Sequence, residues 1–294
     1  MEIALYLCAL AWLFGYIAFI IYLHIVDSRP YISEFTEEQY PKAPSFLNPY
    51  ELSMLLYKKI IPSAFTASIL ILIKKGIILV ERKENDYVFM KFNDTNLSNS
   101  QKDVMMLLFD EIGDGETVKL SSIDRFCKGH DSCSTFLFMY QNWRKNAYRE
   151  VKYKFFEQKK GYMGVKTYRN IGFLLILANF FTGIHFIPIY CMIIPIWVLY
   201  IYFYKIYKRT SEANTEYFKW LGYKNYLLSK DTFSVEEEGH ASIYGVILGL
   251  AAVMDRKLPS KGDFIVSLEA IITKSVRRAT LKGDRSIHLP WSSK

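Results

Sequence analysis

Two long stretches of this sequence contain no Asp, Glu, Lys or Arg, and they restrict its fold more than any other feature. The first covers residues 3–23, which as a helix would reach roughly 31 Å, the thickness of a bilayer core. The second covers residues 170–204, too long for one span, with the turn-forming residues Gly183 and Pro188 near its middle. The sequence therefore predicts three transmembrane helices, one N-terminal and two in a hairpin.

A cleaved signal peptide is the other interpretation of the N-terminal stretch. It fits less well, because Met1-Glu2 supplies no positive charge, the apolar run is long and no small-residue cleavage site follows. We place the hairpin helices at residues 167–184 and 187–204. Asn179 and Pro195 fall inside them, where helix packing explains them better than a transport site.

The positions of the basic residues predict an orientation for these spans. Residues 24–170 hold 22 Lys and Arg and residues 205–294 hold 15, while the N-terminus and the hairpin tip have none. Because cytoplasmic loops are enriched in Lys and Arg, we expect a multi-pass protein of the cell membrane with its N-terminus outside and residues 24–166 and 205–294 in the cytoplasm. Topology then accounts for most of the net charge of +8, and nucleic acid is disfavoured as a partner.

The predicted fold class is a membrane protein that is mainly α with a small β component. The three transmembrane helices accompany an α+β cytosolic part that contains a winged-helix-like unit. The predicted segments are the N-terminal transmembrane helix (1–23), a stalk (24–45), the winged-helix-like unit (46–95), a second cytosolic helical region (96–166), the transmembrane hairpin (167–204) and a C-terminal cytosolic helical region (205–294).

The winged-helix-like unit is predicted from the order helix, helix, hairpin. Asn48-Pro49-Tyr50-Glu51 has the capping residues of a helix start, and this helix is expected to end at Ile61. A second helix, Ser63–Lys75, precedes Gly76, and two strands, Ile77–Glu81 and Tyr87–Lys91, follow.

The second helix of this unit would be the recognition helix if the unit read DNA. Such a helix presents polar and basic side chains to base edges, yet this one has no Arg, Asn or Gln and only two Lys, both at its end. A protein partner is therefore the favoured ligand. Further along the chain we expect helices over residues 98–112, 135–158, 212–228, 242–254 and 264–281, and a short strand, Thr117–Leu120.

Basic and aromatic residues are mixed in the helix predicted over residues 135–158, and the helix predicted over residues 264–281 is amphipathic with a basic face. Single-stranded nucleic acid can stack on such a pattern, but a position beside a membrane span favours contact with anionic lipid. In the last helix, docking on the domain with solvated basic residues explains the pattern equally well. The residues assigned to lipid contact are Arg144, Lys145, Arg149, Lys152, Lys274, Arg277 and Arg278.

The sequence offers no catalytic site and no firm metal site. Cys127, His130 and Cys133 are weak metal candidates, because structural zinc needs four ligands and no second ligand pair is present. The phosphate-binding, dinucleotide-binding, kinase, metalloprotease and serine hydrolase motifs are absent. We expect a protein that is not an enzyme and uses no cofactor.

Several motifs resemble a known family. "NPYELSMLLYKKIIPSAFTASILILIKKGIILVE" resembles its two-helix winged-helix block, and "RTSEANTEYFKWLGYKNYL" and "EEEGHASIYGVILGLAAVMD" are similar to stretches after its membrane hairpin. This is the predicted bacterial membrane protein family called domain of unknown function 2207. Members usually carry an extracellular domain before the first span, so the resemblance implies a shortened member without that domain, which would work with a separately encoded outer partner. Ala213 stands where the family tends to have Gly.

Three functions are compatible with these patterns. The leading hypothesis is a non-enzymatic, membrane-anchored interaction or scaffold module that lies in the lipid bilayer and binds a protein partner, or itself, through its cytosolic domain. The first alternative is a membrane-tethered transcription regulator that binds DNA. The second alternative is an accessory subunit of a transporter, motivated by Asn179 and Pro195 within the hairpin.

Overall fold

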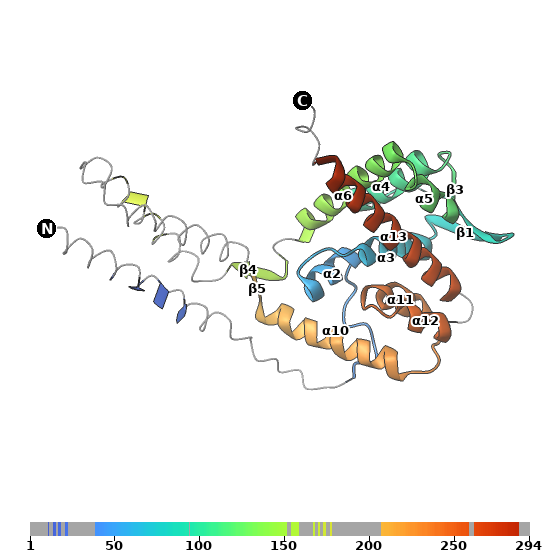
Figure 1. Cartoon of the computed structure of the whole chain (residues 1–294). Helices are drawn as coiled ribbons and strands as arrows, with labels where there is room; N and C mark the ends of the chain where they lie inside the picture. The colour runs from blue at the N-terminus through green and yellow to red at the C-terminus, as the bar shows by residue number, and fades with distance from the viewer. Residues whose placement is uncertain are drawn as a thin grey trace, which may run out of the picture. The chain divides into compact units, whose positions relative to one another are not determined.

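The computed structural model describes residues 39–93, 95–151, 154–158, 207–258 and 262–287, with a few single positions between 11 and 22 and between 167 and 177. The chain divides into two compact units. The smaller holds Met1–Glu34 and Phe155–Asn214, and the larger holds Phe35–Lys154 and Thr215–Lys294. Most described residues belong to the larger unit, whose labelled elements are shown in Figure 1.

The larger unit is mainly helical and has one small antiparallel sheet with the strand order β1-β2-β3. Its elements in chain order are α2 (Pro49–Tyr57), α3 (Pro62–Lys74), β1 (Ile78–Lys83), β2 (Asp86–Lys91), α4 (Asn99–Met105), the π-helix η1 (Met106–Ile112), β3 (Thr117–Lys119), α5 (Leu120–Phe126), α6 (His130–Val151), α10 (Ser211–Ser229), α11 (Val235–Ile247), α12 (Ala251–Lys257) and α13 (Gly262–Ile287). Helix α10 begins in the smaller unit and continues into the larger one at Thr215.

The described part of the smaller unit contains one antiparallel strand pair. β4 (Phe156–Gln158) pairs with β5 (Tyr207–Arg209), with Phe156 opposite Arg209. The Thr210 amide extends the pairing by donating to the carbonyl oxygen of Phe155 at 3.1 Å. The helix predicted over residues 135–158 is therefore too long at its C-terminal end, because α6 ends at Val151.

Many of the helices and strands predicted from the sequence lie near their predicted bounds, and the differences have local causes. Helix α2 ends at Tyr57 rather than Ile61, because Lys58 adopts a left-handed conformation with φ of 57°. The helix predicted over residues 242–254 is instead two helices, α11 and α12, separated at Gly249, whose φ of 76° no helix continues through. Residues 106–112 form a π-helix at the end of α4.

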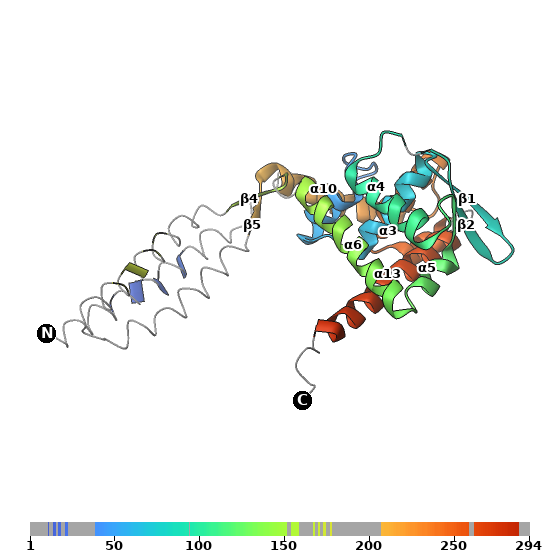
Figure 2. The ribbon, with the colours of Figure 1, turned by 90° about the horizontal axis from the view of Figure 1, so that it is seen from above.

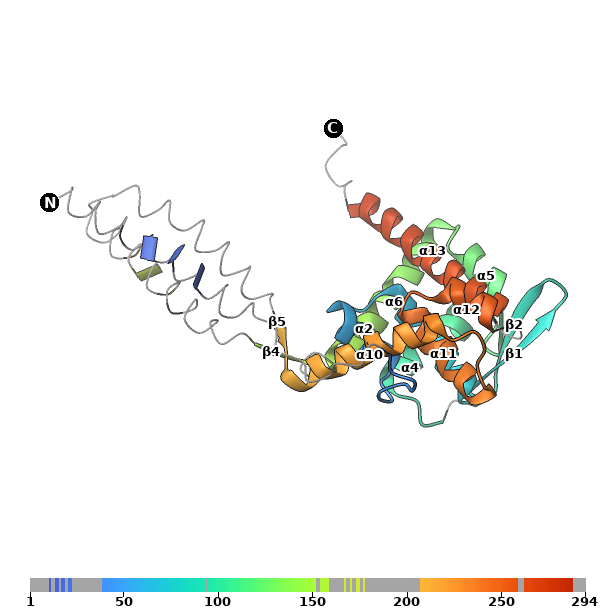
Figure 3. The same ribbon diagram turned by 90° about the horizontal axis from the view of Figure 1, so that it is seen from below.

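Helix α3 lies at the centre of the larger unit. It contacts α2, α4, α11, α13 and β1, and its residues from Ala64 to Leu70 are all buried. Phe65 packs edge-on against Trp143 of α6, with ring centroids 4.9 Å apart. Figure 2 shows α6 and α13 side by side, in agreement with their contacts. Figure 3 shows α11 and α12 near α10.

The predicted fold class needs a correction. The structure supports a mainly helical chain with a small three-stranded sheet, and within the described ranges no helix combines the length and the apolar character needed to cross a bilayer. Helices α6, α10 and α13 are long enough but carry many charged residues, whereas α3 is apolar but has only 13 residues. The stretches expected to span the membrane, residues 3–23 and 167–204, lie outside the described residues except for single positions.

Candidate functional site

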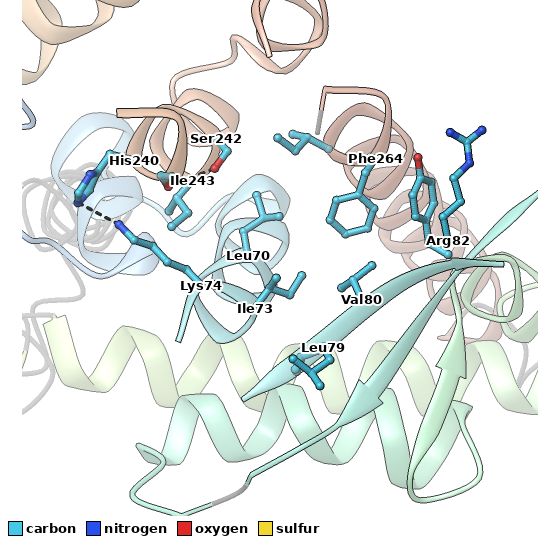
Figure 4. Close-up of a pocket in the computed structure, with 14 residues that line it drawn as sticks. Leu70, Ile73, Lys74, Leu79, Val80, Arg82, His240, Ser242, Ile243 and Phe264 are labelled. Carbon is cyan, nitrogen blue, oxygen red and sulfur yellow. Dashed lines mark hydrogen bonds between the residues drawn. The ribbon is translucent and has the colours of Figure 1, made fainter. Parts of the chain in front are cut away.

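A groove with a cavity volume of about 840 Å³ lies within the larger unit, between α3, β1, α11 and α13. This volume falls in the range of about 300–1,000 Å³ that is typical of ligand sites. Figure 4 shows the side chains that line it. They are Leu70, Ile73 and Lys74 of α3, Ile78, Leu79, Val80 and Arg82 of β1, Tyr87 of β2, Gly239, His240, Ser242 and Ile243 of α11, and Phe264 and Ile265 of α13.

The walls of the groove are apolar. Leu70, Ile243 and Ile265, from three different helices, are each less than a tenth exposed, so they are fixed by packing behind the groove surface. Leu79 is 41% exposed and is the most accessible apolar side chain of the lining. Burial of such a surface by an apolar ligand is favourable, because it removes apolar side chains from water.

One end of the groove is formed by Lys74 and His240. The Lys74 Nζ and His240 Nε2 atoms are 3.1 Å apart, so the ammonium group can donate to a neutral imidazole. The His240 ring stacks on Tyr244 and contacts Phe46, whose side chain is 87% exposed. Gly239 lies 3.5 Å from the Lys74 stem, measured to the position a Cβ would take, so the lysine passes close to the backbone of α11.

The opposite end of the groove is formed by Arg82 and Tyr87, which face each other across β1 and β2. The Arg82 guanidinium lies 5.8 Å from the centre of the Tyr87 ring, within the range of a cation–π contact. The Tyr87 hydroxyl donates to Asp263 at 3.2 Å, and burial followed by the Asp263 charge raises the pKa of this tyrosine. Phe264 packs against Tyr87 and fixes the start of α13 beside the sheet.

The lining of the groove has the chemistry of a binding site. It contains two cations, Lys74 and Arg82, and no carboxylate. His240 has a lysine as its recorded hydrogen-bond partner, and the lining holds neither a cysteine nor a carboxylate that would orient the imidazole for nucleophilic catalysis. An apolar ligand that carries negative charge fits this surface.

The weak metal candidates do not assemble into a metal site. Cys127 and Cys133 are buried free thiols, and burial raises the pKa of Cys127 to about 12. His130 is exposed at the start of α6, where its ring nitrogen lies 3.3 Å from Asp131. Among the residues that the structure describes, no group of three or more His, Cys, Asp and Glu side chains could hold a metal ion.

The residues assigned to lipid contact are divided between two helices and several environments. Arg144, Lys145 and Arg149 are exposed on α6, and Lys152 lies outside the described residues. On α13, Arg277 is exposed. Lys274 and Arg278 instead pair with Asp124 of α5, at 3.3 and 3.1 Å. These ion pairs fit the docking explanation for α13, and lipid contact stays a prediction.

The comparison with protein families gives a match over most of the chain. Residues 37–255 match the C-terminal domain of the predicted membrane proteins of domain of unknown function 2207. The chain belongs to this family. The resemblance seen in the sequence motifs is thereby confirmed, and the family description supports a membrane location for the chain. The matched region includes every groove residue except Phe264 and Ile265. No curated protein and no solved structure gave a match to the chain.

The groove itself could not be found from the sequence. His240 lies in no recognisable motif, and Lys74 is one of the two lysines at the end of the predicted second helix, where the helix dipole explains it. The available signal was weak, because β1 ends in three charged residues, Glu81-Arg82-Lys83, and the two helices that complete the groove begin more than 150 residues later. Without knowledge of which faces of those helices meet β1, no pattern of residues indicates the site.

Proposed function

We propose that this protein is a non-enzymatic, membrane-associated interaction module that holds a partner protein in its groove. The groove carries this proposal, because its walls are apolar, its two ends are cationic and its lining has no set of catalytic groups. A partner that places apolar side chains in the groove and carboxylates at its ends would gain from both features.

The geometry of α3 favours a protein partner over DNA. A recognition helix has to present one face to the major groove, but α3 is covered by α2, α4, α11 and α13. Only its last residues, including Lys74, are exposed. Their position at the end of the helix stabilises the helix dipole without any need for a phosphate partner.

The larger unit, in this proposal, faces the cytoplasm. Its sequence is rich in Lys and Arg, and its described cysteines, Cys127 and Cys133, are free thiols, as is usual in a reducing compartment. A fluorescent protein that matures only in the cytoplasm, fused after Lys294, is expected to be bright. A dark fusion that is nevertheless produced in full would contradict this orientation.

Photocrosslinking in cells tests the interaction. The full chain would carry benzoylphenylalanine in place of Ile73 in the groove, and, as a matched control, in place of the exposed Glu111 of η1. We expect a protein crosslink from position 73 that is absent from position 111. The crosslink should be lost when Leu79→Asp introduces a charge at the most accessible apolar side chain of the lining.

The outcome that contradicts the proposal is equally clear. A groove probe that captures only lipid, or that captures the same proteins as the control position, would show that the groove does not bind a specific partner. Leu79→Asp is chosen because Leu79 is partly exposed, so the domain is expected to fold.

A further inference from the structure

Strand β1 has an open edge. It is the terminal strand of the sheet, with β2 on one side only. The Phe92 amide donates to the Ile77 carbonyl at 3.0 Å, which places these two residues in a hydrogen-bonded pair. Because such pairs alternate in an antiparallel ladder, the amide and carbonyl of Leu79 point to β2, whereas those of Val80 and Arg82 point away from it. In the described part of the chain, no recorded backbone hydrogen bond reaches these outward groups.

The open edge of β1 coincides with the groove. Leu79 and Val80 are neighbours whose side chains lie on opposite faces of the sheet, yet both line the cavity. Because both neighbours line the groove, the groove borders β1 itself, and Figure 4 shows the two side chains on opposite sides of the strand. A further strand placed beside β1 would direct every second side chain into the space between α3, α11 and α13.

The unpaired backbone groups discriminate between possible occupants. An acyl chain or a helix that filled the groove would bury the outward groups of Val80 and Arg82 without partners, at a cost of about 1–3 kcal/mol for each group. An extended peptide pairs the same groups. Strand addition of this kind is a common mode of peptide recognition, in which the backbone gives affinity and alternate side chains give specificity.

The charges of the lining specify the occupant further. Lys74 and Arg82 contribute positive charge, and the lining contains no carboxylate. Asp263 lies beside Tyr87 and offsets part of the charge at the Arg82 end. A negative residue of the partner is therefore best placed near Lys74. The six residues of β1 limit the added strand to about the same length.

We propose that the groove binds an extended, acidic segment of a partner protein, which pairs with the open edge of β1 as an added strand and inserts alternate apolar side chains into the cavity. This inference rests on the proposed function, because it assumes a protein partner, but it fixes the conformation and the chemistry of the bound segment.

Selection with a peptide library tests the chemistry of the occupant. The probe is a phage-displayed library of random ten-residue peptides, panned against the full purified chain. We expect enriched sequences in which apolar residues alternate with polar ones and a carboxylate occurs at one end. Enrichment of helical spacing, or no enrichment above a chain carrying Leu79→Asp, would overturn the proposal.

Hydrogen exchange tests the conformation with one enriched peptide as the probe. Binding should slow exchange of the Val80 and Arg82 amides at least tenfold, while the Leu79 amide, already bonded to β2, should change little. Uniform slowing along β1, or the same alternating pattern with oleate as the probe, would contradict strand addition.

A pair of variants at Val80 isolates the backbone bond. Val80→Pro removes the outward N–H, and edge strands tolerate proline where the N–H faces away from the sheet. We expect at least a tenfold loss of affinity for the enriched peptide, against a much smaller loss for Val80→Ala, which keeps the N–H. If Val80→Pro lowers the unfolding temperature, a peptide N-methylated at alternate amides replaces it, and unchanged affinity of the peptide in both methylation registers would refute the proposal.

Failure of this inference differs from failure of the proposed function. A protein captured at position 73 in cells, combined with unchanged exchange at Val80 and Arg82, would keep a protein partner but remove the added strand. Capture of lipid alone at position 73 would remove both.

Discussion

Helices α3 and α13 line the same groove, but they are stabilised in different ways. α3 is buried on every side, with continuous burial from Ala64 to Leu70. α13 is buried along one stripe, where Ile265, Leu268 and Ile272 recur at intervals of three and four residues. A helix enclosed by its neighbours has no face left for a ligand except at its end. A one-sided helix keeps a second face in solvent, where polar residues can change without effect on the core.

The largest effect is expected for a core substitution in α3. Ile69 is fully buried, so Ile69→Ala removes apolar contacts and leaves a cavity. The free energy of unfolding should fall by about 2–5 kcal/mol. Denaturant unfolding of the full chain in mild detergent, followed by tryptophan fluorescence, measures the change. A loss below about 1 kcal/mol would mean that α3 is not enclosed.

A smaller effect is expected where the two helices are joined. The Ser63 hydroxyl of α3 donates to Glu269 of α13 at 2.6 Å, and the second carboxylate oxygen of Glu269 is buried without a recorded partner. Ser63→Ala should therefore lower the unfolding free energy by about 1.5–3 kcal/mol. Ser267→Ala, on α13, is the matched control and should change it by less than about 0.5 kcal/mol.

A double-mutant cycle sharpens this test. If the hydroxyl acts through the carboxylate, Glu269→Gln should reduce the effect of Ser63→Ala, so that the two losses do not add. Additive losses would show that Ser63 stabilises α3 alone, as a residue of its first turn, and would remove the proposed link between the helices.

The third effect concerns the ion pairs that hold α13 on α5. Burial acts to raise the pKa of Asp124, but hydrogen bonds and charges from Lys128, Lys274 and Arg278 outweigh it, and the pKa is lowered. Lys274 is 59% exposed, which limits the expected loss for Asp124→Asn to about 1 kcal/mol at neutral pH.

The pH dependence of this loss follows from the direction of the pKa shift. A carboxyl with a lowered folded pKa stabilises the protein above its unfolded pKa of about 3.9, and the contribution is lost as the pH falls through the folded pKa. The difference in unfolding temperature between the native chain and Asp124→Asn should therefore be constant from pH 5 to 7 and disappear in acid. A difference that persists below the folded pKa would assign the loss to packing instead.

The smallest effect is expected on the outer face of α13. Arg277 is exposed, so Arg277→Gln should change the unfolding free energy of the purified chain by less than about 0.5 kcal/mol. Thermal unfolding with and without vesicles that contain an anionic lipid gives the measurement. A stabilisation by the vesicles that disappears in Arg277→Gln would support lipid contact at this residue, and no such change would contradict it.

Local signals in the sequence predicted local structure well. Proline in the first turn and Glu51 beside Asn48 place the start of α2, and the Glu51 carboxylate accepts the Asn48 amide at 2.9 Å. Gly76 takes the predicted left-handed conformation after α3, with φ of 68°. These features depend on neighbouring residues only, and a single sequence contains all the information that they need.

Tertiary features were predicted less well, because they depend on distant partners. The short helix α11 could be recognised as a packing helix. The sequence did not show that the helix breaks at Gly249, because a glycine can also occur inside a helix. The π-helix buries Leu107, Leu108 and Phe109 in succession, which a regular helical period does not predict. The groove depends on the order in which four elements pack, which no local pattern indicates.

The walls of the groove come from two parts of the chain that are made at different times. About 160 residues separate the end of α3 at Lys74 from the start of α11 at Val235. At about 5–20 residues per second, a ribosome needs roughly 10–30 s to produce that interval. During this time the apolar surface of α3 lacks two of the helices that cover it in the finished protein. The apolar surface of α3 is therefore left incompletely covered until the last third of the chain has been made.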